Sequence, residues 1–244
     1  MSDAGKTEVI TAQMQSEALM DAFSKLDLGD ELLPEGGADL PPGATVQTFE
    51  GPFYVEVEEN LIRQDITSGR PGIPLLLRFT VLDAARRAPL SGVAVDVWHC
   101  DALGYYSGHL SNDPNVLRGD PRHVAPTDES RFLRGRQFTG EDGTVEFTTI
   151  YPGWYYARSV HIHVKAQLQG HDVYNGQLYL PEEINEVVEK LPPYSHHPEL
   201  QRLPNEQDLG WSMGSSLILD LKQEVDGEPA AGFTGEFTMA IVAH

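Results

Sequence analysis

The chain has a single cysteine, few basic residues and no long apolar run. With only Cys100 among 244 residues, a framework of internal disulfide bonds is excluded. The 17 lysines and arginines face 37 aspartates and glutamates, which gives a formal net charge of -20. Such a surface repels phosphate backbones and anionic lipid headgroups. We therefore expect neither nucleic acid nor a membrane as a partner.

Sequences that would direct the chain to a membrane or out of the cell are also missing. The longest uncharged apolar stretches, such as 73–77, are far shorter than the roughly 20 residues that span a bilayer. The segment from Met1 to Gln15 lacks the basic start and apolar core of a secretory signal. Together with the single cysteine, these absences favour a cytoplasmic protein.

Residues 1–44 differ in character from the rest of the chain. Between Thr7 and Leu28 apolar residues recur at spacings of three and four, which predicts an amphipathic helix. Its apolar stripe must cover either the flank of its own domain or the same helix in a second copy. Residues 33–43 are rich in proline and glycine and indicate a linker. We therefore divide the chain into an N-terminal helix and linker, 1–44, and a main domain, 45–244.

Short strands dominate the main domain. Apolar runs separated by glycine, proline and aspartate predict β-strands at 74–82, 93–99, 145–150, 160–165, 216–221 and 233–242. Within 93–98 valine alternates with other residues, as expected of a strand with two different faces. A second short helix is predicted at 181–190, because acidic residues open that segment. The fold class predicted is mainly β, an antiparallel β-sandwich with an N-terminal helical extension.

The strongest chemical signal is the histidine pair His161 and His163, with Ile162 between them. Residues two apart on a strand point to the same side, so both imidazoles would share one face. Two imidazoles placed in this way form half of a metal site. Two hydrogen-bonded structural histidines are the alternative, and the motif alone does not separate these readings.

A metal on this pair needs anionic ligands from elsewhere. A cupin site would have a carboxylate three or four residues after the second histidine, where this chain has Ala166 and Gln167. Several tyrosines occur just before the pair, within 151–158. A phenolate is a hard oxygen ligand that favours iron(III). Tyrosine is therefore the candidate for the remaining ligands.

On these residues the sequence resembles the intradiol ring-cleavage dioxygenases, a family that includes protocatechuate 3,4-dioxygenase and catechol 1,2-dioxygenase. Its members hold iron(III) with two tyrosines and two histidines. The later tyrosine lies in a Pro-Gly-x-Tyr turn, present at 152–155, and both histidines lie in Arg-x-x-His-x-His, present at 158–163. The earlier tyrosine follows a strand tryptophan by eight residues, which selects Tyr106 after Trp98.

The resemblance covers residues 45–244 and implies one Fe(3+) per chain. The implied ligands are Tyr106, Tyr155, His161 and His163. Tyr105 and Tyr156 stand beside two of them and would point the other way in extended backbone, so the choice within each pair rests on the register of the resemblance.

Roles for nearby residues are implied as well. The family has a Gly-Pro-aromatic segment near its substrate pocket and a Gln-Leu-Tyr strand, so Pro52, Phe53 and Gln177 are expected to bind substrate. Arg158 is expected to stabilise negative charge on the activated ring, with an ordinary salt bridge as its alternative role. Tyr155 is expected to leave the metal as substrate binds and to act as a base.

The implied reaction inserts both atoms of O2 into a catechol-type ring and cleaves it between the two hydroxyl-bearing carbons. The product would be a cis,cis-muconate-type diacid. Ala157 stands where the protocatechuate enzymes commonly have tryptophan, so catechol, a carboxylated catechol and hydroxyquinol all stay open as substrates. Catechol dioxygenases of the family pair through N-terminal helices, which favours a homodimer.

Two other functions stay open at this stage. A non-catalytic transthyretin-like β-sandwich binding module would use the tyrosines and histidines structurally. A different metalloenzyme would hold zinc or iron(II) on the histidine pair with a carboxylate such as Asp172. The remaining histidines, His109 among them, are expected to be structural or at the surface.

Overall fold

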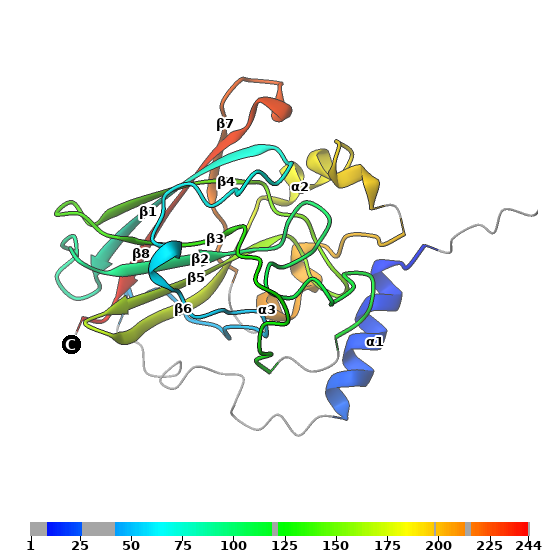
Figure 1. The fold of residues 1–244 in the computed structure, drawn as a ribbon, viewed down its shortest axis with the longest axis horizontal. Helices are drawn as coiled ribbons and strands as arrows, with labels where there is room; N and C mark the ends of the chain where they lie inside the picture. Colours follow the sequence, from blue (N-terminus) through cyan, green and yellow to red (C-terminus); the bar gives the residue numbers. More distant parts are fainter. Residues whose placement is uncertain (1–8, 26–41, 119–121, 198, 213–215, 244) are drawn as a thin grey trace, which may run out of the picture.

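The fold is a sandwich of two four-stranded sheets with an N-terminal helix, α1, against one end (Figure 1). The structure, a computed structural model, describes residues 9–25, 42–118, 122–197, 199–212 and 216–243. Most of the predicted linker therefore lies outside the described residues. The predicted fold class is confirmed.

The first sheet has the strand order β4-β1-β8-β7. Its central strands are β1 (Pro74–Asp83) and β8 (Phe233–Ile241), which run parallel to each other. The outer strands β4 (Thr144–Ile150) and β7 (Asp220–Gln223) pair antiparallel with them. The sandwich is thus antiparallel except at the β1–β8 pair. The strand expected at 216–221 begins later, at Asp220.

The second sheet has the order β3-β2-β5-β6 and is antiparallel throughout. It consists of β3 (Arg134–Phe138), β2 (Ala94–Trp98), β5 (His161–Leu168) and β6 (His171–Tyr179). The predicted strands at 93–99 and 160–165 are confirmed as β2 and β5. β3 was missed because its sequence, RGRQF, has no alternation of apolar and polar residues.

The hydrophobic core lies between the two sheets. It takes alternate residues of β1, β2 and β5, among them Leu77, Phe79, Val95, Val97, Ile162 and Val164. The outer face of the second sheet is buried too, since every residue of β2 is buried. Loops cover that outer face, and the candidate site lies beneath them.

Short helices complete the fold. The predicted helix at 181–190 is confirmed as α2 (Glu182–Val188), and α3 (Leu209–Ser212) is a single turn. The 3-10 turns within the described ranges are η2 (Glu59–Leu61), η3 (Tyr194–His196), η4 (Asn205–Gln207) and η5 (Pro229–Ala231). Within the described ranges, no helix is long and apolar enough to cross a membrane.

Helix α1 (Ala12–Ser24) packs against its own domain. The Gln15 side chain is fully buried; its amide donates to the Gln201 carbonyl (2.7 Å), and its carbonyl accepts from the Ala157 N–H (2.8 Å). Leu19, one turn further along, is also buried. Of the two partners considered from the sequence, the helix therefore covers the flank of its own domain through these residues.

Replacing Gln15 by Ala should lower the free energy of unfolding by about 1–3 kcal/mol, because it removes the partner of the buried Ala157 N–H and of the part-buried Gln201 carbonyl. Gln13→Ala is the matched control, since Gln13 lies on the exposed side of the same helix, where its side chain donates to Glu17. That variant should change stability by less than about 0.5 kcal/mol. Urea denaturation measures both values, and equal losses would show that the Gln15 contacts do not stabilise the fold.

Candidate metal centre

His161 and His163 project from the outer face of β5. Each is only 1% exposed, and their Nε2 atoms lie 3.1 Å apart. Ile162, between them, lies in the core on the opposite face. The predicted sharing of one strand face is confirmed.

Tyr106 and Tyr155 reach the same point from two loops. The Tyr106 hydroxyl lies 3.1 Å from His163 Nε2 and 3.4 Å from His161 Nε2. The Tyr155 hydroxyl lies 3.4 Å from His161 Nε2. In the described part of the chain, neither Tyr105 nor Tyr156 hydrogen-bonds these histidines. The structure therefore brings together the four residues chosen as ligands.

The two tyrosine loops touch each other at glycines. A Cβ atom at Gly104 would lie 2.4 Å from the Trp154 carbonyl oxygen, and one at Gly153 would lie 2.5 Å from the Ala102 carbonyl oxygen. Any larger residue would push the loops apart, so glycine is required at both positions. This contact sets Tyr106 beside Tyr155.

The two imidazoles are arranged as neutral ligands. His161 Nδ1 donates to the Ser159 carbonyl (2.7 Å), which leaves the lone pair of Nε2 facing the tyrosines. Burial, reinforced by the nearby Arg158 cation, lowers the pKa of His161 to about 3. Burial also lowers the pKa of His163 well below its ordinary value. The His163 ring stacks on Trp98 at 4.8 Å, which fixes its orientation.

The phenols need a cation to ionise here. Burial raises the pKa of Tyr155 and raises that of Tyr106 well above the ordinary value. A metal ion next to the oxygens reverses this effect, because it stabilises the phenolate directly. Two neutral nitrogens and two phenol oxygens around one point suit a hard trivalent cation such as iron(III).

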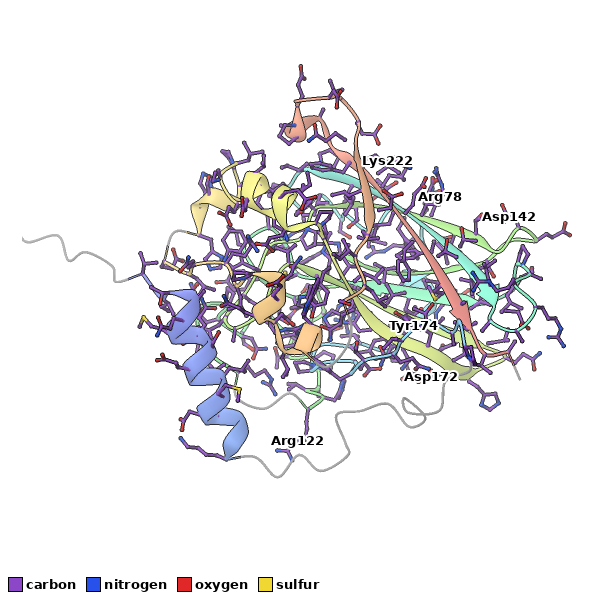
Figure 2. The ribbon with its side chains drawn as sticks, turned by 180° about the vertical axis from the view of Figure 1, so that it is seen from behind. Arg78, Arg122, Asp142, Asp172, Tyr174 and Lys222 are labelled. Atoms are coloured by element: carbon purple, nitrogen blue, oxygen red, sulfur yellow. The ribbon has the colours of Figure 1, made fainter. Side chains whose placement is uncertain are left out.

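Asp172 does not belong to this cluster. Its carboxylate pairs with Lys165 (2.9 Å) and accepts a hydrogen bond from Gln167 (2.7 Å). Figure 2 shows Asp172 at the end of β6 that lies away from α1. Among the residues that the structure describes, no group of three or more His, Cys, Asp or Glu could hold a metal. A site built from the histidine pair and Asp172 is therefore contradicted.

Arg158 is buried beside Tyr155. Its Nη1 donates to the Tyr155 hydroxyl (3.1 Å), its Nε donates to Asp208 (2.9 Å), and its Nη2 donates to the Gln177 side chain. Both roles considered from the sequence are thus compatible with its position. The guanidinium forms a buried salt bridge and also faces a proposed ligand.

Asp208 is the residue that sequence reasoning missed. Its carboxylate accepts from Arg158, from the Ser159 N–H (2.7 Å), from the Tyr179 hydroxyl (2.6 Å) and from the Gly210 N–H (2.8 Å). Burial raises the pKa of Asp208, but the Arg158 cation and these donors outweigh it, so the pKa lies below its ordinary value. The buried carboxylate therefore anchors Arg158. No motif in the sequence marks this position.

A cavity of about 340 Å³ opens beside Tyr106 and Tyr155. Phe53 lines it and stacks on Tyr106, with ring centroids 4.7 Å apart. His109, expected to be structural or at the surface, is buried and also lines this cavity. A flat ring placed here would lie next to Tyr106 and Tyr155, two of the four candidate ligands.

The other two residues predicted to bind substrate lie in different places. Pro52 lines a smaller hollow of about 50 Å³ that also borders Phe53 and Tyr155. Gln177 instead lies behind Arg158, and its amide donates to the Phe49 carbonyl (3.0 Å). In the described part of the chain it lines neither cavity, so its placement supports a positioning role rather than substrate contact.

The chain is similar to known dioxygenases in sequence. The family model described as Dioxygenase matches residues 49–183, which include all four candidate ligands and Arg158. Catechol 1,2-dioxygenase 1 of Acinetobacter lwoffii is 31% identical over 154 residues, which cover 62% of this chain and 42% of that enzyme. The match thus spans less than half the length of that relative.

Solved structures agree with the sequence matches. An intradiol ring-cleavage dioxygenase from Tetranychus urticae has a TM-score of 0.71 and 31% identity, covering 83% of this chain and 95% of that one. The dioxygenase domain of a carbohydrate-binding fusion protein from Streptomyces sp. SirexAA-E has a TM-score of 0.57 and 28% identity, covering 82% and 99%. The chain belongs to the intradiol ring-cleavage dioxygenase family. The matches to dioxygenases argue against the alternative considered from the sequence, a non-catalytic transthyretin-like binding module.

Proposed function

We propose that this chain is an iron(III)-dependent dioxygenase that cleaves a catechol-type ring between its two hydroxyl-bearing carbons. Tyr106, Tyr155, His161 and His163 would hold one iron. The observation that carries the proposal is the convergence of two imidazole nitrogens and two phenol oxygens, 3.1 to 3.4 Å apart, beside a cavity. Bound there, iron(III) would bind both substrate oxygens and withdraw electron density, so that the ring reacts with O2.

The substrate must lose two protons to bind through both oxygens, and Tyr155 is placed to accept one of them. Its hydroxyl already receives a hydrogen bond from Arg158 (3.1 Å). The Arg158 cation lowers the pKa of Tyr155 and so partly offsets the larger effect of burial, which would favour the phenolate when Tyr155 is not bound to the metal. Arg158 thereby holds the base in position at the edge of the cavity.

Arg158 has a second task at the same place. Its charge lies in a buried, water-poor site, where a fixed cation stabilises developing negative charge more than it would in water. The salt bridge to Asp208 (2.9 Å) and the hydrogen bond to Gln177 prevent the guanidinium from turning away. Arg158 is thus pre-oriented before the substrate ring becomes negatively charged.

The partners follow from this site. A cavity of about 340 Å³ is at the small end of ligand sites, which suits a single-ring catechol together with O2.

The homodimer and the cytoplasmic location stay predictions. Met14 and Met20 of α1 are 44% and 69% exposed, so these apolar side chains would be accessible to a second copy.

The purified protein should contain about one iron per chain and show a visible band from phenolate-to-iron charge transfer. Replacing both Tyr106 and Tyr155 by Phe should abolish the band. The matched control replaces their neighbours Tyr105 and Tyr156 by Phe and should keep both colour and iron. Absorption spectra and metal analysis of the two double variants give the answer. A full band in the first variant would show that other residues hold the metal.

Arg158→Lys should keep the iron and the visible band but lower kcat by about 10- to 100-fold, because lysine keeps the charge and loses the planar donor geometry. Arg202→Lys is the matched control. Arg202 is as buried as Arg158 and pairs with the more exposed Glu182 and Glu189 away from the site, so the variant should keep kcat within about twofold. Steady-state kinetics with catechol decide between them. Equal kcat values would assign Arg158 a purely structural role.

A further inference from the structure

A buried cation without a carboxylate partner lies beside Tyr106. Four of the described lysine and arginine residues are buried, and Arg134, at 2% exposure, is the least exposed of them. The other three form salt bridges: Arg158 with Asp208, Arg202 with Glu182 and Glu189, and Lys165 with Glu50 and Asp172. Among the residues that the structure describes, no carboxylate forms a salt bridge with Arg134, whose side chain instead bonds Ser107.

Hydrogen bonds from Arg134 hold the residue that follows Tyr106. Its Nε donates to the Ser107 hydroxyl (2.9 Å), and its Nη2 donates to the Ser107 carbonyl (2.8 Å). These neutral partners fix the guanidinium but do not balance its charge. Burial accordingly lowers the pKa of Arg134 to about 9, so the side chain is still a cation at neutral pH. Of the nearby groups, an ionised Tyr106 most opposes this effect on the pKa of Arg134.

The guanidinium of Arg134 lies over the ring of Tyr106, with its Cζ 5.9 Å from the ring centroid. The sheet register explains this position. Arg134 stands opposite Trp98 in the β2–β3 pair, and Trp98 stands opposite His163 in the β2–β5 pair. One row across the second sheet therefore holds a candidate ligand, the ring that stacks on it and the buried cation.

The charge of Arg134 is compensated only when Tyr106 is ionised. A buried charge without a counter-charge strongly destabilises a fold. A phenolate spreads its negative charge over the oxygen and the ring, so a cation over the ring stabilises the phenolate more than the neutral phenol. Because a metal ion on Tyr106 produces the phenolate, loading the site would supply the counter-charge that Arg134 lacks.

From this geometry we infer that Arg134 is a positioning residue that acts through Tyr106. It holds negative charge on the Tyr106 phenolate, and bound iron(III) is thereby kept a strong electron acceptor. The inference rests on the proposed function, because it names a residue outside the ligand set that tunes the same site. Charge held on Tyr106 is not donated to the metal, so the metal withdraws more from the substrate oxygens. Arg158 contacts the other tyrosine, Tyr155, so each phenolate has its own arginine.

The test measures the reduction potential of iron in the loaded full chain, without substrate. Arg134→Gln removes the charge but keeps a donor for Ser107. In a redox buffer set to the wild-type midpoint, the ratio of reduced to oxidised iron should fall about tenfold in this variant, or ~59 mV for a one-electron couple. The reason is that losing a nearby positive charge disfavours the added electron. Arg134→Lys keeps the charge and should keep this ratio within about twofold.

Arg63→Gln is the matched control. Arg63 donates to the Arg134 carbonyl (2.9 Å) but is partly exposed, so this variant removes the same charge from the same region where water screens it. The ratio should stay within about twofold of the wild-type value. An unchanged ratio in Arg134→Gln, equal shifts in Arg134→Gln and Arg134→Lys, or an equal shift in Arg63→Gln would overturn the inference. If Arg134→Gln fails to fold, Arg134→Met removes the charge while filling the buried space and takes its place.

Resonance Raman spectra excited in the visible band identify the tyrosine that responds, because each phenolate ligand contributes its own vibrations. The vibrations that change in Arg158→Lys belong to Tyr155. Arg134→Gln should shift the other set more strongly. A shift confined to the Tyr155 set would contradict the assignment to Tyr106.

Catechol turnover, measured separately, distinguishes this inference from the proposed function. A loaded protein whose potential shifts as predicted but which cleaves no catechol would refute the proposed function and keep the inference about Arg134. A protein that cleaves catechol, with a potential that does not depend on Arg134, would do the reverse. A loaded wild-type protein without a phenolate band would refute both.

Discussion

The outer face of β5 has to be both polar and buried, and the rest of the site depends on that constraint. One strand supplies Ile162 and Val164 to the core and, on its other side, His161 and His163. Two uncharged imidazoles that are buried away from solvent need neighbouring groups that can form hydrogen bonds with them. The loops carrying Tyr106 and Tyr155 provide this cover, and their contact at Gly104 and Gly153 sets the spacing.

Because the site is buried, the charged side chains in it must also compensate one another. Arg158 and Asp208 are both buried, and each compensates the other through a direct salt bridge. The pair is held by hydrogen bonds from β6 and from the segment after η4, so it cannot move apart without leaving a buried charge unpaired, at about 3–5 kcal/mol. The guanidinium is therefore a fixed positive charge beside Tyr155. Under the proposed function, that fixed charge would help Tyr155 to act both as a ligand and as a base.

Short-range patterns made much of this predictable from the sequence. The prediction that His161 and His163 share one face followed from the two-residue period of a strand. The choice of Tyr106 and Tyr155 followed from the register of the short motifs shared with the family. Asp208 could not be found in this way, because it meets Arg158 through a contact between residues 50 positions apart in the sequence. Gln177 was expected at the site as a substrate-binding residue, which stays a prediction, but its hydrogen bond with Arg158 was not foreseen.

β3 is an element of the fold that likewise could not be predicted from a local sequence pattern. Its residues have no apolar alternation, yet Gly135 lies so close to Ile66 that an added Cβ would come within 2.4 Å of that side chain. Packing against a distant segment, rather than local pattern, makes β3 a strand. The helix α1 was recognised from its period, but its sequence left two surfaces open, and the contacts of Gln15 show that it covers the flank of its own domain.

The proposed function is tested most directly by the position at which the ring opens and by the product atoms that come from O2. Catechol should be supplied to the iron-loaded protein under ¹⁸O2, and the product identified by mass spectrometry. We predict a cis,cis-muconate-type diacid that carries both labelled atoms, one in each new carboxylate. A ring opened beside the diol to give an aldehyde, or a product with a single labelled atom, would contradict intradiol cleavage at this site.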